Sequence, residues 1–138
     1  ASVALPGIPA MGGLAQRSLK LYDVVPFKTA AAGFEKHHGV LDVWAAANIS
    51  GYVRKGANTP TILLTKELHA AATAVQQQWR TALTGTIAGE INWAKIGAKE
   101  MQGLADKALD AARVPPASRE RYYQAFHEYV YAEFLKKQ

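Results

Sequence analysis

The chain has 138 residues, of which 49% are hydrophobic and 20% are charged, as is typical of one globular domain that buries its own core. It contains no cysteine, which excludes disulfides, zinc–thiolate sites and a thiol nucleophile, and leaves histidine, carboxylate and amide side chains as possible metal ligands. The net charge is +5, and no apolar run is long enough to span a membrane.

The positive charge is unevenly distributed along the chain. Residues 17–80 carry eight basic and four acidic side chains, whereas residues 81–138 carry eight and seven. The excess therefore lies in the part of the chain that also contains three of the four histidines. An anionic polymer such as nucleic acid would be attracted there through phosphate contacts, although an ordinary soluble surface could also carry this charge.

Residues 1–16 are rich in glycine, proline and alanine and carry no charge, which predicts a linker or N-terminal extension. The chain starts at Ala1 without a methionine or a basic signal-peptide start, so we expect a piece of a larger polypeptide with upstream domains. Two short apolar runs follow, residues 19–25 and 29–34, and each could form a strand or part of a short helix.

The pair His37-His38 comes next, and Gly39 marks a turn directly after it. Residues 42–48 predict a short helix within a loop, and residues 61–64 predict a short strand.

A longer helix is predicted to begin after Thr65, a good N-cap residue, with Glu67 in the first turn, where the helix dipole favours an acid. Apolar side chains at helical spacing predict its buried face: Leu68, Ala72, Val75, Trp79 and Leu83. A more polar stripe lies beside that face and could face a ligand; it consists of His69, Thr73, Gln76 and Arg80.

Two further helices are predicted in the last third of the chain. Residues 101–112 carry an apolar stripe and are followed by Pro115-Pro116, which end the helix. Ser118 is predicted to cap the final helix, with His127 near its surface. The apolar face of this helix and the tryptophans are expected to lie in the core: Tyr122, Phe126, Tyr129, Val130 and Phe134, with Trp44, Trp79 and Trp93.

Three of the four histidines fall between residues 37 and 69, an arrangement that suits metal-dependent phosphodiester hydrolysis. One imidazole can deprotonate water, for which we expect His38, and others can hold a cation against the phosphate. His69 would lie at about the fourth position of its helix, where the positive end keeps the ring neutral, as a metal ligand must be. Asn58 could orient the base or supply an amide oxygen. The basic residues expected to contact flanking phosphates are Arg54, Lys55, Lys66 and Arg80.

His37-His38, a loop of about twenty residues and the segment from Pro60 to His69 together resemble the His-Me finger (ββα-metal, HNH or endonuclease VII-like) nucleases. More narrowly, they resemble the toxin domains at the C-termini of bacterial polymorphic toxins and secretion-system effectors. The resemblance covers about residues 33–80. It implies that His37 and His69 bind the metal and that His38 is the base.

The resemblance also implies a fold that is mostly α with a small ββα-metal element in a single domain. Its ββα core would span about residues 33–83 and a helical tail residues 90–137, within a domain at residues 17–138. Two features depart from the family pattern. Many members carry a further histidine four residues after the helix histidine, where this chain has Thr73. The middle asparagine is expected nearer the second strand, so Asn58 lies slightly early and Asn48 is a rival.

We therefore expect a metal-dependent endonuclease, an antibacterial toxin domain secreted by a bacterium and active in the cytoplasm of the target cell. The expected cofactor is a divalent ion (Mg, Mn, Ni or Zn) at a site with few protein ligands. Expected partners are DNA, although the residues do not separate it from RNA, and a cognate acidic immunity protein, with no membrane. A non-catalytic helical module that binds protein or nucleic acid, with incidental histidines, is the alternative.

Overall fold

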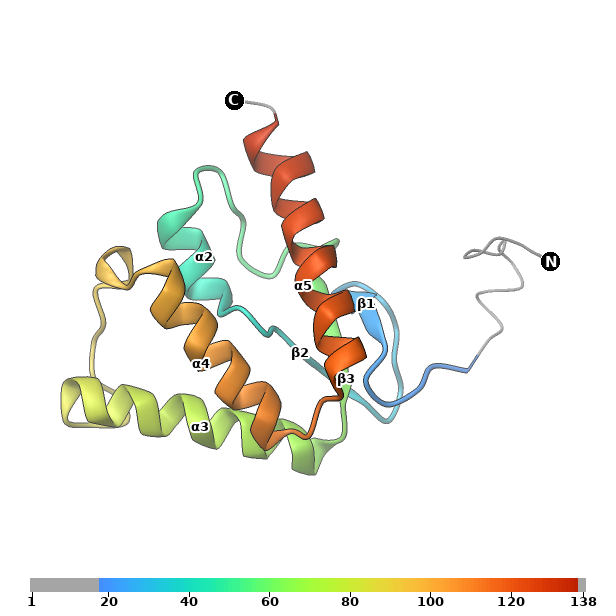
Figure 1. The fold of residues 1–138 in the computed structure, drawn as a ribbon, viewed down its shortest axis with the longest axis horizontal. Coiled ribbons are helices and arrows are strands. Elements are labelled where there is room, and N and C mark those ends of the chain that lie inside the picture. The colour runs from blue at the N-terminus through green and yellow to red at the C-terminus, as the bar shows by residue number, and fades with distance from the viewer. Residues whose placement is uncertain (1–17, 137–138) are drawn as a thin grey trace.

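The computed structural model describes residues 18–136 and contains a small antiparallel sheet beside the helices (Figure 1). The second strand of this sheet ends at His37, and His38 follows it directly. The predicted linker at residues 1–16 lies outside the described residues. The sheet has the order β1–β3–β2, with β1 at Val24–Pro26, β2 at Glu35–His37 and β3 at Pro60–Leu64. Of the two apolar runs, residues 19–25 lead into β1, whereas residues 29–34 form turns.

The central strand β3 pairs with both other strands of the sheet. All five of its residues are buried, because β1 and β2 flank it in the sheet and α5 (Pro116–Val130) and α3 (Lys66–Thr84) pack against it. In the antiparallel register, His37 pairs with Ile62 and Glu35 with Leu64, the last residue of β3. The end of β3 and the start of α3 are therefore placed beside β2.

Helix α3 begins where the sequence predicts, directly after Thr65. The Thr65 hydroxyl accepts a hydrogen bond from the Leu68 backbone N–H at 3.1 Å, and Gly85 ends the helix with φ +90°. Helix α3 packs against α4 (Ala98–Ala111). On its predicted face Ala72 is fully buried, Leu68, Val75 and Trp79 are half-buried against the core, and Leu83 in the last turn is 49% exposed. The predicted buried stripe is thus wrong at its end, because helical spacing defines a face but not how far a partner covers it.

The remaining elements are α2 (Asp42–Asn48), the 3₁₀ turn η1 (Trp93–Lys95) and the π-helical turn η2 (Tyr131–Leu135), which continues α5. The apolar stripe of α4 is buried as predicted, and so are Tyr122, Phe126 and Val130 of α5. The predicted cap of α5 is wrong. Pro115 is the N-cap, Pro116 occupies the first turn, and Ser118 is buried inside the helix.

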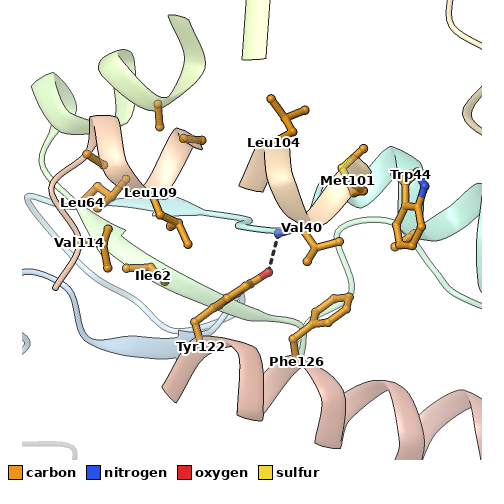
Figure 2. Packing of buried hydrophobic residues seen from close by; sticks show 14 of the residues in the cluster. Val40, Trp44, Ile62, Leu64, Met101, Leu104, Leu109, Val114, Tyr122 and Phe126 are labelled. Atoms are coloured by element: carbon orange, nitrogen blue, oxygen red, sulfur yellow. Dashed lines mark hydrogen bonds between the residues drawn. The ribbon is translucent and has the colours of Figure 1, made fainter. Parts of the chain in front are cut away.

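Tyr122 joins α5 to the segment directly after the histidine pair. Its phenolic oxygen accepts a hydrogen bond from the Val40 N–H at 2.8 Å, within the apolar cluster that Figure 2 shows. Gly39 is required at this approach, since a Cβ there would lie 2.6 Å from the Tyr122 ring. The end of β2 is therefore fixed by a helix more than eighty residues away in sequence.

The tryptophans divide between core and surface. Trp44 is buried and donates its indole N–H to the Ile96 carbonyl at 2.7 Å. Trp79 and Trp93 are only half-buried and stack on each other, with ring centroids 5.8 Å apart, so the prediction of three core anchors holds for one. The fold class is confirmed: one small, mostly helical domain with a small antiparallel sheet. Within residues 18–136, no helix combines the length and apolarity needed to cross a membrane.

Candidate metal centre

β2 and α3 bring His37 and His69 face to edge. Their ring centroids lie 5.5 Å apart, with the ring planes at 71°. The contact follows from two periodicities: Glu35 and His37 lie on one face of β2 because strand residues alternate, and His69 lies in the first turn of α3. The sequence interval of thirty-two residues between them is closed by the pairing of β2 with β3.

Glu35 completes this contact. Its Oε1 lies 2.7 Å from Nδ1 of His69. In the sequence Glu35 is adjacent to Lys36 and close to the histidine pair, so either could be its partner, and the structure decides between them. Lys36 lies on the other face of β2, where its Nζ donates to the carbonyls of Phe27 and Thr29.

His37 is held as a neutral imidazole. Its side chain is 2% exposed, and burial lowers its pKa to about 3, with smaller contributions from the neighbouring His69 and His38. Its Nε2 is buried and has no hydrogen-bond partner among the described residues. A buried polar atom without a partner costs free energy, and this one belongs to a ring in contact with a second imidazole, an arrangement that suits a bound ligand.

His38 faces different neighbours. Its ring lies 5.2 Å from that of Phe27, and its Nε2 is also buried without a partner among residues 18–136. Burial lowers its pKa, the charge of Asp42 opposes this, and the charges of Lys55 and His69 lower the pKa further. His38 is therefore predominantly neutral at pH 7 and can accept a proton.

Asp42 organises the loop next to His38. Its carboxylate accepts hydrogen bonds from the Tyr52 hydroxyl at 2.8 Å and from the Lys55 backbone N–H at 2.6 Å. Burial and the bond to Asp42 raise the pKa of Tyr52, so its hydroxyl stays a donor. Lys55 has φ +57°, an uncommon conformation for this residue type that the bond to Asp42 stabilises.

A family model for HNH/Endo VII superfamily toxins with a SHH signature matches residues 31–131, most of the chain and all of this site. The chain belongs to this family. The match includes the single His-His pair of the sequence, which is preceded here by Lys36 and not by serine. A search of solved structures found no significant match. Membership in the HNH/Endo VII superfamily toxins suggests a nuclease toxin, and members of the superfamily generally use divalent metal ions.

The donor atoms of this toxin domain fit a divalent ion with few protein ligands. Imidazole suits Zn²⁺ and Ni²⁺, and the unpartnered Nε2 of His37 next to His69 is the kind of group such an ion would satisfy. No cluster of three or more His, Asp or Glu side chains with metal-binding geometry occurs in residues 18–136. His37 and His69 would therefore hold the ion together with water.

The two asparagine candidates lie in different surroundings. Asn58 is exposed in the turn before β3, and its side chain has no partner within the described part of the chain. Asn48 lies at the end of α2 and donates its amide N–H groups to the carbonyls of Trp44 and Trp93, both at 2.9 Å. Asn48 thus ties α2 to η1, and no hydrogen bond within residues 18–136 joins either asparagine to His37, His38 or His69.

The four predicted phosphate-binding residues are spread around the ββα element. Lys55 is the one whose charge affects the pKa of His38. Arg54 is exposed beside it, and Lys66 is exposed at the start of α3. Arg80 lies about three turns from His69 on the same helix, with its guanidinium 5.6 Å from the Trp93 ring centroid. The role of Asp42 has no signal in the sequence, because its partners Tyr52 and Lys55 lie in a separate loop.

Proposed function

We propose that this toxin domain is a metal-dependent endonuclease that hydrolyses phosphodiester bonds in DNA. The observation that carries the proposal is the edge contact of His37 and His69 at 5.5 Å beside an unpartnered His37 Nε2. Buried imidazoles without partners are costly in a purely structural role, and they suit metal ligation. In this assignment His37 and His69 hold the ion, and His38 is the general base.

A bound divalent ion would supply Lewis-acid stabilisation of the charge that develops on the phosphate and the leaving oxygen. Burial lowers the pKa of His38, which keeps its imidazole neutral at pH 7, the state that a general base requires. Asn58 would orient His38 or contribute an amide oxygen. Lys55, held beside His38 by Asp42, would contact the phosphate next to the scissile bond, and Arg54, Lys66 and Arg80 would contact flanking phosphates.

The biological setting proposed for this activity is competition between bacteria. The domain would be secreted as part of a larger polypeptide, delivered into a target cell and active in its cytoplasm. A producing cell must block such an enzyme, so we propose a cognate immunity protein with an acidic face. The excess of positive charge in residues 17–80 supports this choice, because nucleic acid and an acidic protein would both be attracted to it.

Plasmid nicking by the purified domain tests the proposal. Nicking should be lost on chelation and restored by Mg²⁺, Mn²⁺, Ni²⁺ or Zn²⁺, and expression of the domain alone should inhibit growth of a bacterial host. His38→Ala should abolish both effects, while His127→Ala, which changes an exposed histidine on α5, should retain both. A domain that neither nicks DNA with any of these ions nor inhibits growth would instead favour a non-catalytic binding module.

A further inference from the structure

We propose that Glu35 is a positioning residue that selects the tautomer and the ring orientation of His69. With its Nδ1–H donated to Glu35, His69 would present the Nε2 lone pair to the ion that His37 also binds. The proposal deepens the metal-dependent nuclease function proposed above and rests on it, but it concerns a residue whose effect can be measured without any cleavage.

The contact between Glu35 and His69 is built into the fold. Glu35 pairs in register with Leu64, the last residue of β3, and α3 starts two residues later at Lys66. A side chain on this face of β2 therefore lies opposite the first turn of α3, where His69 stands. The distance of 2.7 Å between Oε1 and Nδ1 is that of a strong hydrogen bond.

Glu35 and His37 reach His69 from the same strand face. Because they are two residues apart on β2, one side chain contacts the Nδ1 of His69 while the other approaches the ring edge-on. Each imidazole has one donor and one acceptor nitrogen when neutral. A carboxylate accepts only, so it fixes Nδ1 as the donor and Nε2 as the acceptor.

A purely structural role for the pair of Glu35 and His69 would add little to the stability of the fold. The side chains are 31% exposed for His69 and 46% exposed for Glu35, and ion pairs at such surface positions contribute little to stability. The opposite face of β2 already has its own anchor in Lys36, which binds two backbone carbonyls. Glu35 can therefore be replaced with little effect on the fold, so its effect on His69 can be tested in isolation.

The test compares Glu35→Ala, Glu35→Gln and the control Glu67→Ala, which removes an acid from the first turn of α3, two residues from His69. Two-bond ¹⁵N–¹H correlation spectra of the metal-free proteins report the tautomer of His69, and calorimetric titration with Zn²⁺ reports the affinity. Glu35→Ala should lose the single tautomer and bind Zn²⁺ about 10- to 100-fold more weakly. Glu35→Gln keeps an acceptor oxygen and should restore most of both properties.

Equal tautomer spectra and equal Zn²⁺ affinities in Glu35→Ala and Glu67→Ala would overturn the positioning role. A different result would contradict the metal-dependent nuclease function on which this proposal rests. A wild-type protein that shows the predicted tautomer, and loses it in Glu35→Ala, but binds no divalent ion would support the Glu35 contact and contradict the metal-dependent function.

Discussion

The polar side chains buried around α4 and α5 have hydrogen-bond partners, whereas two histidines at the end of β2 each bury a nitrogen that has none. The buried hydroxyl of Tyr122 accepts from Val40, and the half-buried hydroxyl of Tyr123 donates to Asp106 at 2.6 Å. His37 and His38 each bury an Nε2 without a partner in residues 18–136. A satisfied buried group stabilises one arrangement of the core, while an unsatisfied one costs stability and persists where function requires it. The buried polar groups of the helical part are therefore paired, whereas the ββα element contains the unpaired groups that the proposed chemistry would use.

The largest effect is expected on cleavage, and it distinguishes the proposed base His38 from the proposed metal ligand His69. His38→Ala should lower the cleavage rate by about 10²- to 10⁴-fold while leaving metal affinity nearly intact, since a base moves a proton and does not coordinate. His69→Ala should abolish both, because few other protein ligands are present. Plasmid nicking and calorimetric metal titration measure the two properties. A His69→Ala protein that still binds metal and cuts DNA would remove the metal assignment.

The pH dependence of stability should come largely from His37. Its pKa is about 3 when folded against 6.5 for an ordinary histidine, so below pH 6.5 the unfolded chain takes up a proton that the folded one cannot. The free energy of unfolding should therefore fall as the pH drops from 6.5 towards 3, by up to about 1.4 kcal/mol per pH unit. Urea unfolding at several pH values should show a weaker dependence in His37→Leu. The same substitution at exposed His127 is the control, and equal flattening in both variants would contradict the prediction.

Tyr122→Phe tests the helical side of the comparison. Removing the hydroxyl leaves the buried Val40 N–H without an acceptor and should lower the free energy of unfolding by about 1–3 kcal/mol. Tyr131→Phe changes a tyrosine that is 60% exposed and should stay within about 0.5 kcal/mol of wild type.

At pH 7.5, His37→Leu should lower the free energy of unfolding by less than Tyr122→Phe does, since it replaces an unpartnered polar group by an apolar one. A larger loss of stability in His37→Leu than in Tyr122→Phe would contradict the contrast between the two regions.

The smallest effect is expected at the surface. Combining Arg54→Ala with Lys55→Asn should weaken DNA binding and make the negative slope of log affinity against log salt less steep by about 1.8, at about 0.9 for each phosphate that the protein no longer neutralises. Asparagine is chosen because it tolerates the positive φ of Lys55. The matched control is Lys99→Ala with Lys107→Ala in α4. Slopes that do not differ between the two double variants would place Arg54 and Lys55 outside the interface.

Local signals were sufficient for much of the fold. Thr65 and Gly85 define the ends of α3, residues 42–48 form the expected helix, and the apolar stripe of α4 is buried. These features depend on capping and periodicity, which neighbouring residues determine. The cap of α5 and the burial of Leu83 were predicted wrongly, because a proline competed with Ser118 as the helix start and α3 is not covered along its whole length.

The amino-acid pattern is enough to identify the histidine window, its resemblance to the HNH nucleases and the place of His69 in a helical first turn. The side chains that surround these rings become known only from the folded chain. Glu35 could pair with Lys36 or with a histidine until strand alternation put the two on opposite faces of β2. The charges of Asp42 and Lys55 act on His38 because a loop folds back onto Asp42. Gly39 packs against Tyr122, which lies far away in sequence. Such contacts depend on the packing of distant elements, so no local pattern predicts them.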